Sequence, residues 1–259
     1  MSRIILTSKE GHVGTIAFNR PKANCYETVF MRQFNEAIKE LNADSDVRVV
    51  VVKSDIERFF SAGADIYAFQ KNSTETNKAL VDLARRALSM IEASGKIYIA
   101  SLNGHTLGGG LEIALACDIR IGGDGPYYLG LPEVKLGLIT GNGGSQRLTR
   151  TVGRSKALEL TVTGENIGPA EAHRIGLLHR LVPAGDLAQE TEAFAQTLAN
   201  GAPLAMAALK KCIKKGSEMP LEDGLALEAS LVDQLYDTAD AQEGFKAFTE
   251  KRPPIYQGR

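Results

Sequence analysis

The chain has 259 residues and lacks several features that would assign it to a class at once. It has no tryptophan and only three cysteines (Cys25, Cys117 and Cys212), which are far apart and form no CxxC pair. This spacing argues against a disulfide framework and against a zinc site, and the scattered histidines likewise suggest no metal site. No run reaches the roughly 18 apolar residues of a membrane span, and the first residues have too short an apolar run for a signal peptide. We therefore expect a cytoplasmic protein, or one of an organelle matrix if the source is eukaryotic.

An excess of one charge is also missing. The net charge is −1, so no global field would attract nucleic acid or an anionic membrane. The basic stretch from Lys210 to Lys215 is interpreted first as the solvated face of a helix, with a phosphate-contacting or partner-contacting face as the alternative. Hydrophobic residues make up 44% of the chain and charged residues 24%, as in ordinary globular proteins. The length suits one large domain, or a domain with an appendage.

The first two thirds of the sequence alternate between strands and helices. Strands are predicted over residues 13–18, 47–52, 97–102, 118–121 and 127–129, and helices over residues 26–41 and 79–91. The polar segment from Gln70 to Thr76 is expected to be a mobile loop. The repeating unit is strand, strand, helix, which indicates an α/β fold.

Beyond about residue 185 the strands end. Residues 187–198, 205–213, 221–236 and 239–251 each read as a helix, with Gly or Pro between them. We therefore expect a core over residues 1–185 and a helical region over residues 186–259. Such an appendage often packs against a neighbouring subunit.

Two glutamates carry the strongest chemical signal. Glu112 closes the run Gly108-Gly109-Gly110-Leu111-Glu112, and Glu133 lies shortly before the glycine loop that begins at Gly141. Paired carboxylates in a dry pocket can divide acid and base work between them. Glycine-rich turns at helix starts offer backbone N–H groups to a developing oxyanion. Together they indicate proton chemistry next to an activated carbonyl.

Several motifs in order resemble the crotonase (enoyl-CoA hydratase/isomerase) family over roughly residues 4–255. They are Phe60-Ser61-Ala62-Gly63-Ala64-Asp65-Ile66, Asn103-Gly104, Gly108-Gly109-Gly110-Leu111-Glu112, Ala116-Cys117-Asp118-Ile119-Arg120, Gly130-Leu131-Pro132-Glu133, Gly137 and Gly143-Gly144-Ser145-Gln146-Arg147-Leu148. The resemblance implies a spiral of ββα units followed by a C-terminal helical trimerisation region, in a homotrimer or a hexamer made of two trimers. It also implies an acyl-CoA thioester substrate, with coenzyme A as part of the substrate and no separate cofactor.

The resemblance also implies roles for individual residues. Glu112 would take a proton from water as the water attacks Cβ of a trans-2-enoyl thioester, and Glu133 would give a proton to Cα. The N–H groups of Ala64 and Gly109 would form the oxyanion hole. Substrate binding is expected at Ala62, Asp65, Ile66, Gly141 and Lys251, with the Gly141 N–H helping to hold the Glu133 carboxylate and Lys251 reaching the CoA phosphates of a neighbouring subunit. Asp65 is also expected to cap the following helix.

Both glutamates together are typical of hydratases in this family, so a hydro-lyase that forms 3-hydroxyacyl-CoA is the leading hypothesis. A crotonase-type isomerase, or a specialised lyase or hydratase for a branched or cyclic acyl-CoA, is the second. A CoA- or RNA-binding protein with little catalysis is the third, and the net charge and the intact acid pair weigh against it. The usual Asn-Ala-Leu-Asn stretch is replaced here by Asn24-Cys25-Tyr26-Glu27, a change that could reshape the acyl pocket.

Overall fold

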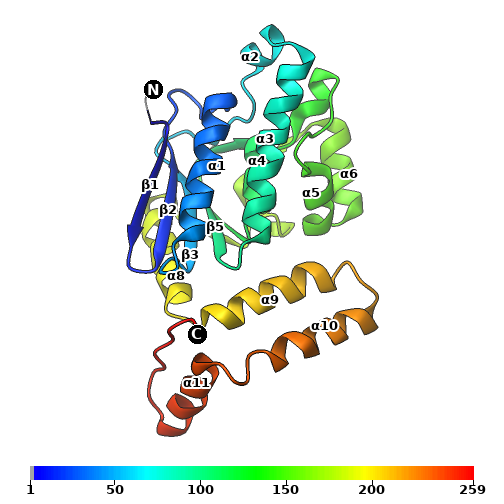
Figure 1. Cartoon of the computed structure of the whole chain (residues 1–259). Helices are drawn as coiled ribbons and strands as arrows, with labels where there is room; N and C mark the ends of the chain where they lie inside the picture. Colours follow the sequence, from blue (N-terminus) through cyan, green and yellow to red (C-terminus); the bar gives the residue numbers. More distant parts are fainter. Residues whose placement is uncertain (1–2) are drawn as a thin grey trace.

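The computed structural model describes residues 3–259, and two β-sheets form the centre of the chain (Figure 1). The larger sheet has six strands in the order β1-β2-β3-β5-β7-β10. Its strands are β1 (Ile5–Glu10), β2 (Val13–Phe18), β3 (Val49–Ser54), β5 (Ile97–Leu102), β7 (Ile119–Gly123) and β10 (Arg180–Val182). Only β1 and β2 pair antiparallel, and every later neighbour is parallel.

The smaller sheet has four strands in the order β4-β6-β8-β9. These are β4 (Phe59–Ser61), β6 (His105–Leu107), β8 (Leu129–Gly130) and β9 (Asn166–Ile167). Successive pairs β3 and β4, β5 and β6, and β7 and β8 each give one strand to each sheet before the chain enters a helix. The predicted strand, strand, helix repeat is thus confirmed.

Helices separate the strands along the chain. They are α1 (Thr28–Ala43), α2 (Ile66–Lys71), α3 (Thr74–Ala93), α4 (Gly109–Ala116), α5 (Gly144–Val152), α6 (Arg154–Thr163), α7 (Pro169–Arg174) and α8 (Leu187–Ala199), with 3₁₀ turns η1 (Pro132–Leu136) and η2 (Ala184–Asp186). The valine side chains of β3 point alternately to the two faces of the sheet, as side chains of a strand buried on both faces do. Val50 and Val52 face the core built with α1, α3 and α4, whereas Val49 and Val51 face α8.

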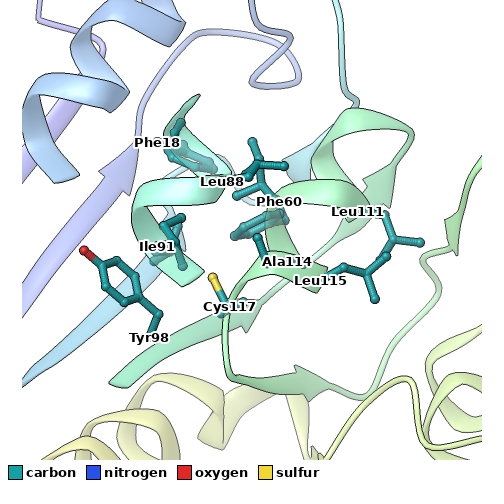
Figure 2. Packing of buried hydrophobic residues seen from close by; sticks show 14 of the residues in the cluster. Phe18, Phe60, Leu88, Ile91, Tyr98, Leu111, Ala114, Leu115 and Cys117 are labelled. Atoms are coloured by element: carbon teal, nitrogen blue, oxygen red, sulfur yellow. The ribbon is translucent and has the colours of Figure 1, made fainter. Parts of the chain in front are cut away.

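The main core is centred on aromatic rings and on α4. Phe18 lies within 5.0–5.3 Å of three other phenylalanine rings, measured between ring centroids. Figure 2 shows Phe60 of β4 beside Ala114 of α4, with Leu88 of α3 close by. Every residue of α4 is buried, so this short helix is fixed on all sides. A functional group carried on α4 is therefore held rigidly.

The expectation of a mobile loop from Gln70 to Thr76 is wrong. Helix α2 runs to Lys71, and α3 begins at Thr74. Ser73 is the N-cap of α3, and its side chain accepts a hydrogen bond from the Thr76 N–H at 3.2 Å. A serine at this position satisfies a helix donor that would otherwise have no partner. The polar residues here therefore cap helices rather than form a loop.

The C-terminal helices are present as predicted, but their division from the core differs in detail. Helix α8 packs on the larger sheet, whereas α9 (Pro203–Gly216), α10 (Leu221–Asp233) and α11 (Ala239–Glu250) project from the core (Figure 1). The region predicted over residues 186–259 thus begins with a helix, α8, that packs on the larger sheet, and its boundary at residue 185 stays a prediction. The tail returns toward the core, where the Arg48 guanidinium donates to the carbonyls of Ala199 and Tyr256.

The basic stretch of α9 is not simply a solvated face. Lys210 is buried and donates to the carbonyls of Ile91 and Lys96 at 3.0 and 2.9 Å. Its ammonium also lies 2.9 Å from the Asp118 carboxylate, which pairs with Lys214 at 2.7 Å. Both lysines anchor α9 to the core, and the burial of Lys210 removes it from the solvated face, whereas Lys211 and Lys215 are exposed. Between residues 3 and 259 no helix is both long and apolar enough to cross a membrane.

Candidate active site

Three neighbouring parallel strands of the smaller sheet end at one edge. Gly108 donates its N–H to the Gly130 carbonyl at 2.9 Å, which joins the end of β6 to the end of β8. Residues that follow β4, β6 and β8 therefore meet, as loops at the carboxyl ends of parallel strands do. Ala64 follows β4, Glu112 follows β6 and Glu133 follows β8. The topology brings the predicted chemical groups to a single place.

Glu112 is buried in the first turn of α4, with 1% of its surface exposed. Its Oε1 accepts the backbone N–H groups of Asn142 and Gly144 at 2.7 and 2.8 Å. Its Oε2 accepts the side-chain amide of Asn142, also at 2.7 Å. A buried carboxylate needs such donors because an unpaired charge is costly to bury. The glycine loop before α5 therefore cradles the carboxylate of Glu112.

Glu133 occupies a different environment. It is the second residue of η1, and Pro132 sets the first position of that turn. Its Oε2 is buried and has no hydrogen-bond partner among the described residues. A Cβ atom on Gly108 would lie only 3.0 Å from Oε1 of Glu133, so this carboxyl lies against the entrance of α4. Glu133 therefore keeps a free oxygen beside the element that carries Glu112.

Burial raises the pKa of both carboxyl groups, but hydrogen-bond donors oppose the rise more strongly at Glu112. Burial raises the pKa of Glu112, and the N–H groups of Gly144 and Asn142 partly offset that rise because they favour the charged form. Burial raises the pKa of Glu133 to about 7, and the negative charge of Glu112 adds to the rise. The N–H donors thus favour the charged form of Glu112, whereas no side-chain or loop donor does so at Oε2 of Glu133.

The two backbone N–H groups predicted for an oxyanion lie on adjoining segments. A Cβ atom on Gly63 would lie 3.0 Å from the nitrogen of Gly109, so the segment that carries Ala64 touches the start of α4. Any side chain at Gly110 would collide with the carbonyl of Ser61, so only glycine allows these two backbone segments to lie this close. Across residues 3–259, no carbonyl accepts the N–H of Ala64, and the N–H of Gly109 begins a helix and has no acceptor within it.

The remaining predicted binding residues have distinct surroundings. Asp65 caps α2 by accepting the Ala68 N–H at 3.2 Å, as expected, and it pairs with Arg20 at 2.9 Å. Ile66 is 48% exposed. Ala62 donates its N–H to the Ala23 carbonyl at 2.9 Å, and its role in substrate binding stays a prediction.

Two predictions concern residues farther along the chain. The N–H groups of the glycine loop that hold a carboxylate are those of Asn142 and Gly144, and they hold Glu112 rather than Glu133. Gly141 instead accepts a hydrogen bond from Arg85 at its carbonyl. Lys251 follows α11 in the helical extension, apart from α4 in the same chain (Figure 1). Its reach into a neighbouring subunit stays a prediction.

Sequence reasoning did not assign roles to Asn142 and Tyr26. The available signal for Asn142 was its position as the one residue with a side chain in the glycine loop Gly141-Asn142-Gly143-Gly144. The Tyr26 hydroxyl accepts a hydrogen bond from the Asn142 amide at 3.0 Å. The edge of the Tyr26 ring occupies the space that a side chain at Gly109 would need. Both residues therefore belong to the site.

Other parts of the described chain offer weaker chemistry. A cavity of about 550 Å³ lies between the larger sheet and α8, and its buried Ser101 and Thr191 hydroxyls bond each other at 3.1 Å. His105 packs between two aromatic rings, tilted against Phe59 and stacked on Tyr128. No group of three or more metal-ligating side chains suited to hold an ion occurs between residues 3 and 259.

Comparison with known proteins agrees with this geometry. The family described as enoyl-CoA hydratase/isomerase matches residues 8–259. The short-chain-enoyl-CoA hydratase of Clostridium acetobutylicum is 35% identical over 96% of this chain and 95% of its own length. A solved enoyl-CoA hydratase from Bacillus anthracis superposes with a TM-score of 0.96 at 34% identity, covering 99% of this chain and all of the other.

A second solved structure, an enoyl-CoA hydratase from Geobacillus kaustophilus, has a TM-score of 0.96 at 41% identity and covers 100% of this chain and 98% of the other. The match extends over the paired carboxylates, the glycine turns and the C-terminal helices alike. The chain therefore belongs to the enoyl-CoA hydratase/isomerase, or crotonase, family of enzymes.

Proposed function

We propose that this enzyme is an enoyl-CoA hydratase, which adds water reversibly to a trans-2-enoyl-CoA and yields a 3-hydroxyacyl-CoA. One observation carries the proposal. The two carboxyl groups at the strand ends have unlike surroundings, with three N–H donors on Glu112 and an unpartnered oxygen on Glu133. Hydration needs a base for water and an acid for Cα at the same time, and unlike carboxyl groups can supply both.

Glu112 takes a proton from water while the water oxygen bonds to Cβ, and the electron pair of the double bond shifts toward the thioester carbonyl. The resulting negative charge lies on the thioester oxygen, where the N–H groups of Ala64 and Gly109 stabilise it. Glu133 then gives its proton to Cα. Exchange with solvent removes the proton from Glu112 and returns one to Glu133, which restores the starting enzyme.

The oxyanion donors are backbone groups, so they are fixed before substrate arrives. Loss of a single donor of this kind costs about 10²–10³ in rate in enzymes generally. Coenzyme A takes part as the thioester portion of the substrate, and Lys251 of a neighbouring subunit would contact its phosphates. We further propose a homotrimer, or a pair of trimers, formed through the projecting helices. Exposed apolar residues on these helices support an assembly, among them Leu209, Ile213, Leu221 and Phe248.

The first experiment follows the conjugated-thioester absorbance while purified protein meets crotonyl-CoA, with the product identified by mass. Loss of the conjugated signal with gain of one water is the expected result. A matched reaction with a 3-enoyl-CoA detects double-bond migration instead. Migration without hydration would assign the enzyme to the isomerase branch of the family.

Two isosteric variants test the assigned roles. Glu112→Gln and Glu133→Gln should each lower kcat by about 10²–10⁴-fold, the range for loss of a general acid or base. Circular dichroism checks that both variants keep the fold. Near-full turnover in either variant would remove that glutamate from the mechanism.

A further inference from the structure

The side chain of Asn142 has an unusual set of contacts. Its amide nitrogen donates to Oε2 of Glu112 at 2.7 Å and to the hydroxyl of Tyr26 at 3.0 Å, while its amide oxygen is buried without a partner. Both amide hydrogens are thus used, and the acceptor is not. The opposite orientation of the amide would place its oxygen against the Glu112 carboxylate, which an ionised Glu112 would disfavour. The amide is therefore arranged as a donor.

These contacts leave Glu112 with one free acceptor position. An ionised carboxylate offers about four lone-pair sites. Two backbone N–H groups occupy Oε1, and the Asn142 amide occupies one site on Oε2. The remaining site is on Oε2, the oxygen that Asn142 holds. Asn142 thus fixes the oxygen that is left to accept a proton.

Tyr26 is itself held in place by the backbone. Its N–H donates to the Gly63 carbonyl at 2.8 Å, and its carbonyl accepts the Asp65 N–H at 2.9 Å. Its ring is buried, with 4% of the residue exposed, and lies against Gly109. Burial raises the pKa of the phenol, with the charges of Glu112 and Glu133 adding to the rise, so the hydroxyl stays neutral. A fixed, neutral hydroxyl can orient the amide of Asn142.

We propose that Asn142 and Tyr26 are positioning residues for Glu112, in which the Asn142 amide fixes the proton-accepting oxygen and the Tyr26 hydroxyl fixes the amide. This inference rests on the proposed role of Glu112 as the base. Neither side chain needs to touch the substrate for it to hold. The role differs from simple packing because it controls both the direction and the basicity of one carboxylate oxygen.

The proposal has a distinct kinetic signature. A hydrogen bond to the charged form lowers a carboxyl pKa, so removal of the Asn142 amide raises the pKa of Glu112. As the pH falls, Glu112 then becomes protonated at a higher pH than in the wild type. The acid limb of the pH profile of kcat/KM therefore moves to higher pH by about one unit. Loss of a charge-assisted hydrogen bond corresponds to about 10–100-fold in rate. The loss should fall on kcat, with little change in KM.

The test uses Asn142→Ala, Tyr26→Phe and the double variant in the full-length enzyme. Alanine keeps the backbone N–H that bonds Glu112 and removes the two hydrogen bonds of the Asn142 amide. Phenylalanine keeps the ring that packs on Gly109 and removes only the hydroxyl. Asn200→Ala, an exposed helix end far along the chain, is the control. Crotonyl-CoA hydration is measured from pH 5 to 9. Asn142→Ser replaces the alanine variant if that one does not fold.

The expected result is a lowered kcat and a raised acid limb for Asn142→Ala, with a smaller change of the same kind for Tyr26→Phe. In the Asn142→Ala background, Tyr26→Phe should add nothing, because Tyr26 acts through Asn142. An unchanged acid limb in Asn142→Ala would overturn the proposal. Independent, multiplicative effects of the two variants would overturn the part assigned to Tyr26.

A second readout separates this inference from the proposed function. Carbon-13 NMR of glutamate labelled at the side-chain carboxyl gives the pKa of Glu112 without any substrate, with Glu112→Gln identifying the signal. A higher pKa in Asn142→Ala supports the positioning role whether or not crotonyl-CoA is hydrated. A wild-type enzyme that binds crotonyl-CoA but does not hydrate it would contradict the proposed reaction alone. An unchanged Glu112 pKa in Asn142→Ala would contradict the positioning role alone.

Discussion

Glu133→Gln should stabilise the fold above neutral pH even though it lowers activity. The carboxyl of Glu133 has a pKa of about 7 in the folded chain, against an ordinary value of 4.5. Below 4.5 the group is protonated whether the chain is folded or unfolded, so it does not oppose folding. As pH rises, the unfolded chain ionises first and gains stability relative to the folded one. The wild type thus loses stability between about pH 4.5 and 7, and the uncharged glutamine does not.

The magnitude follows from the difference between the two pKa values. A rise of about 2.5 pH units corresponds to about 3.4 kcal/mol if the group were fully shielded. Because Glu133 is partly exposed, solvent screening reduces this. We expect Glu133→Gln to be more stable than wild type by about 1–2 kcal/mol at pH 8 and nearly equal to it at pH 4.5.

Urea unfolding followed by circular dichroism at pH 4.5, 6, 7 and 8 measures this difference, at one fixed protein concentration because assembly shifts apparent stability. Glu112→Gln is the matched control. That carboxylate accepts three N–H donors, and a glutamine amide would turn its own hydrogens toward one or more of them. The control should therefore be destabilised at pH 8. A stability difference for Glu133→Gln that does not grow with pH would refute the reasoning.

Three further predictions concern packing and assembly. Gly109→Ala should cost about 1–3 kcal/mol of stability in urea unfolding, because its methyl group would overlap the Tyr26 side chain. When Gly109→Ala is combined with Tyr26→Ala, the loss of stability should be smaller than the sum of the two single losses. A purely additive loss would mean that the two side chains do not collide. Lys210→Ala should lower the free energy of unfolding by about 3 kcal/mol in the same assay, because it removes a buried partner of Asp118. A smaller loss of stability than that of an exposed lysine variant would argue that Lys210 does not anchor α9 to the core. Phe248→Glu should lower the sedimentation coefficient toward that of a single chain without loss of the helical circular-dichroism signal, because Phe248 is 86% exposed on α11. An unchanged sedimentation coefficient would exclude Phe248 from the interface.

The elements with regular patterns could be predicted from the sequence. Residues 13–18 and 97–102 form strands with the predicted bounds, because alternation and buried β-branched runs have few other solutions. Glu112 stood out because an acid within an apolar helix is costly unless it has a function or a partner. The glycine turns were informative for a similar reason, since close approach of backbone requires them.

Other parts depended on contacts that no local pattern encodes. Helix α6 exposes Leu158 and Val162, so its sequence shows no clean apolar face, and the helix was not predicted. The segment before α3 looked like a loop because helix-capping residues are the same polar types that loops use. Lys210 looked solvated because its partner, Asp118, is distant in sequence. Asn142 was missed because its importance comes from Glu112 and Tyr26, which only the fold brings beside it.

The support of the Glu112 carboxylate also bears on how such a site can diverge. One of its oxygens is held only by the backbone N–H groups of Asn142 and Gly144, and a side chain at Gly144 would lie 3.0 Å from that same oxygen. This half of the support therefore requires a glycine at position 144, whereas the N–H of residue 142 survives any replacement except proline. The other oxygen depends on one replaceable side chain, Asn142. Evolution can thus vary the strength of the base at a single codon while the inherited chain path keeps the carboxylate in place.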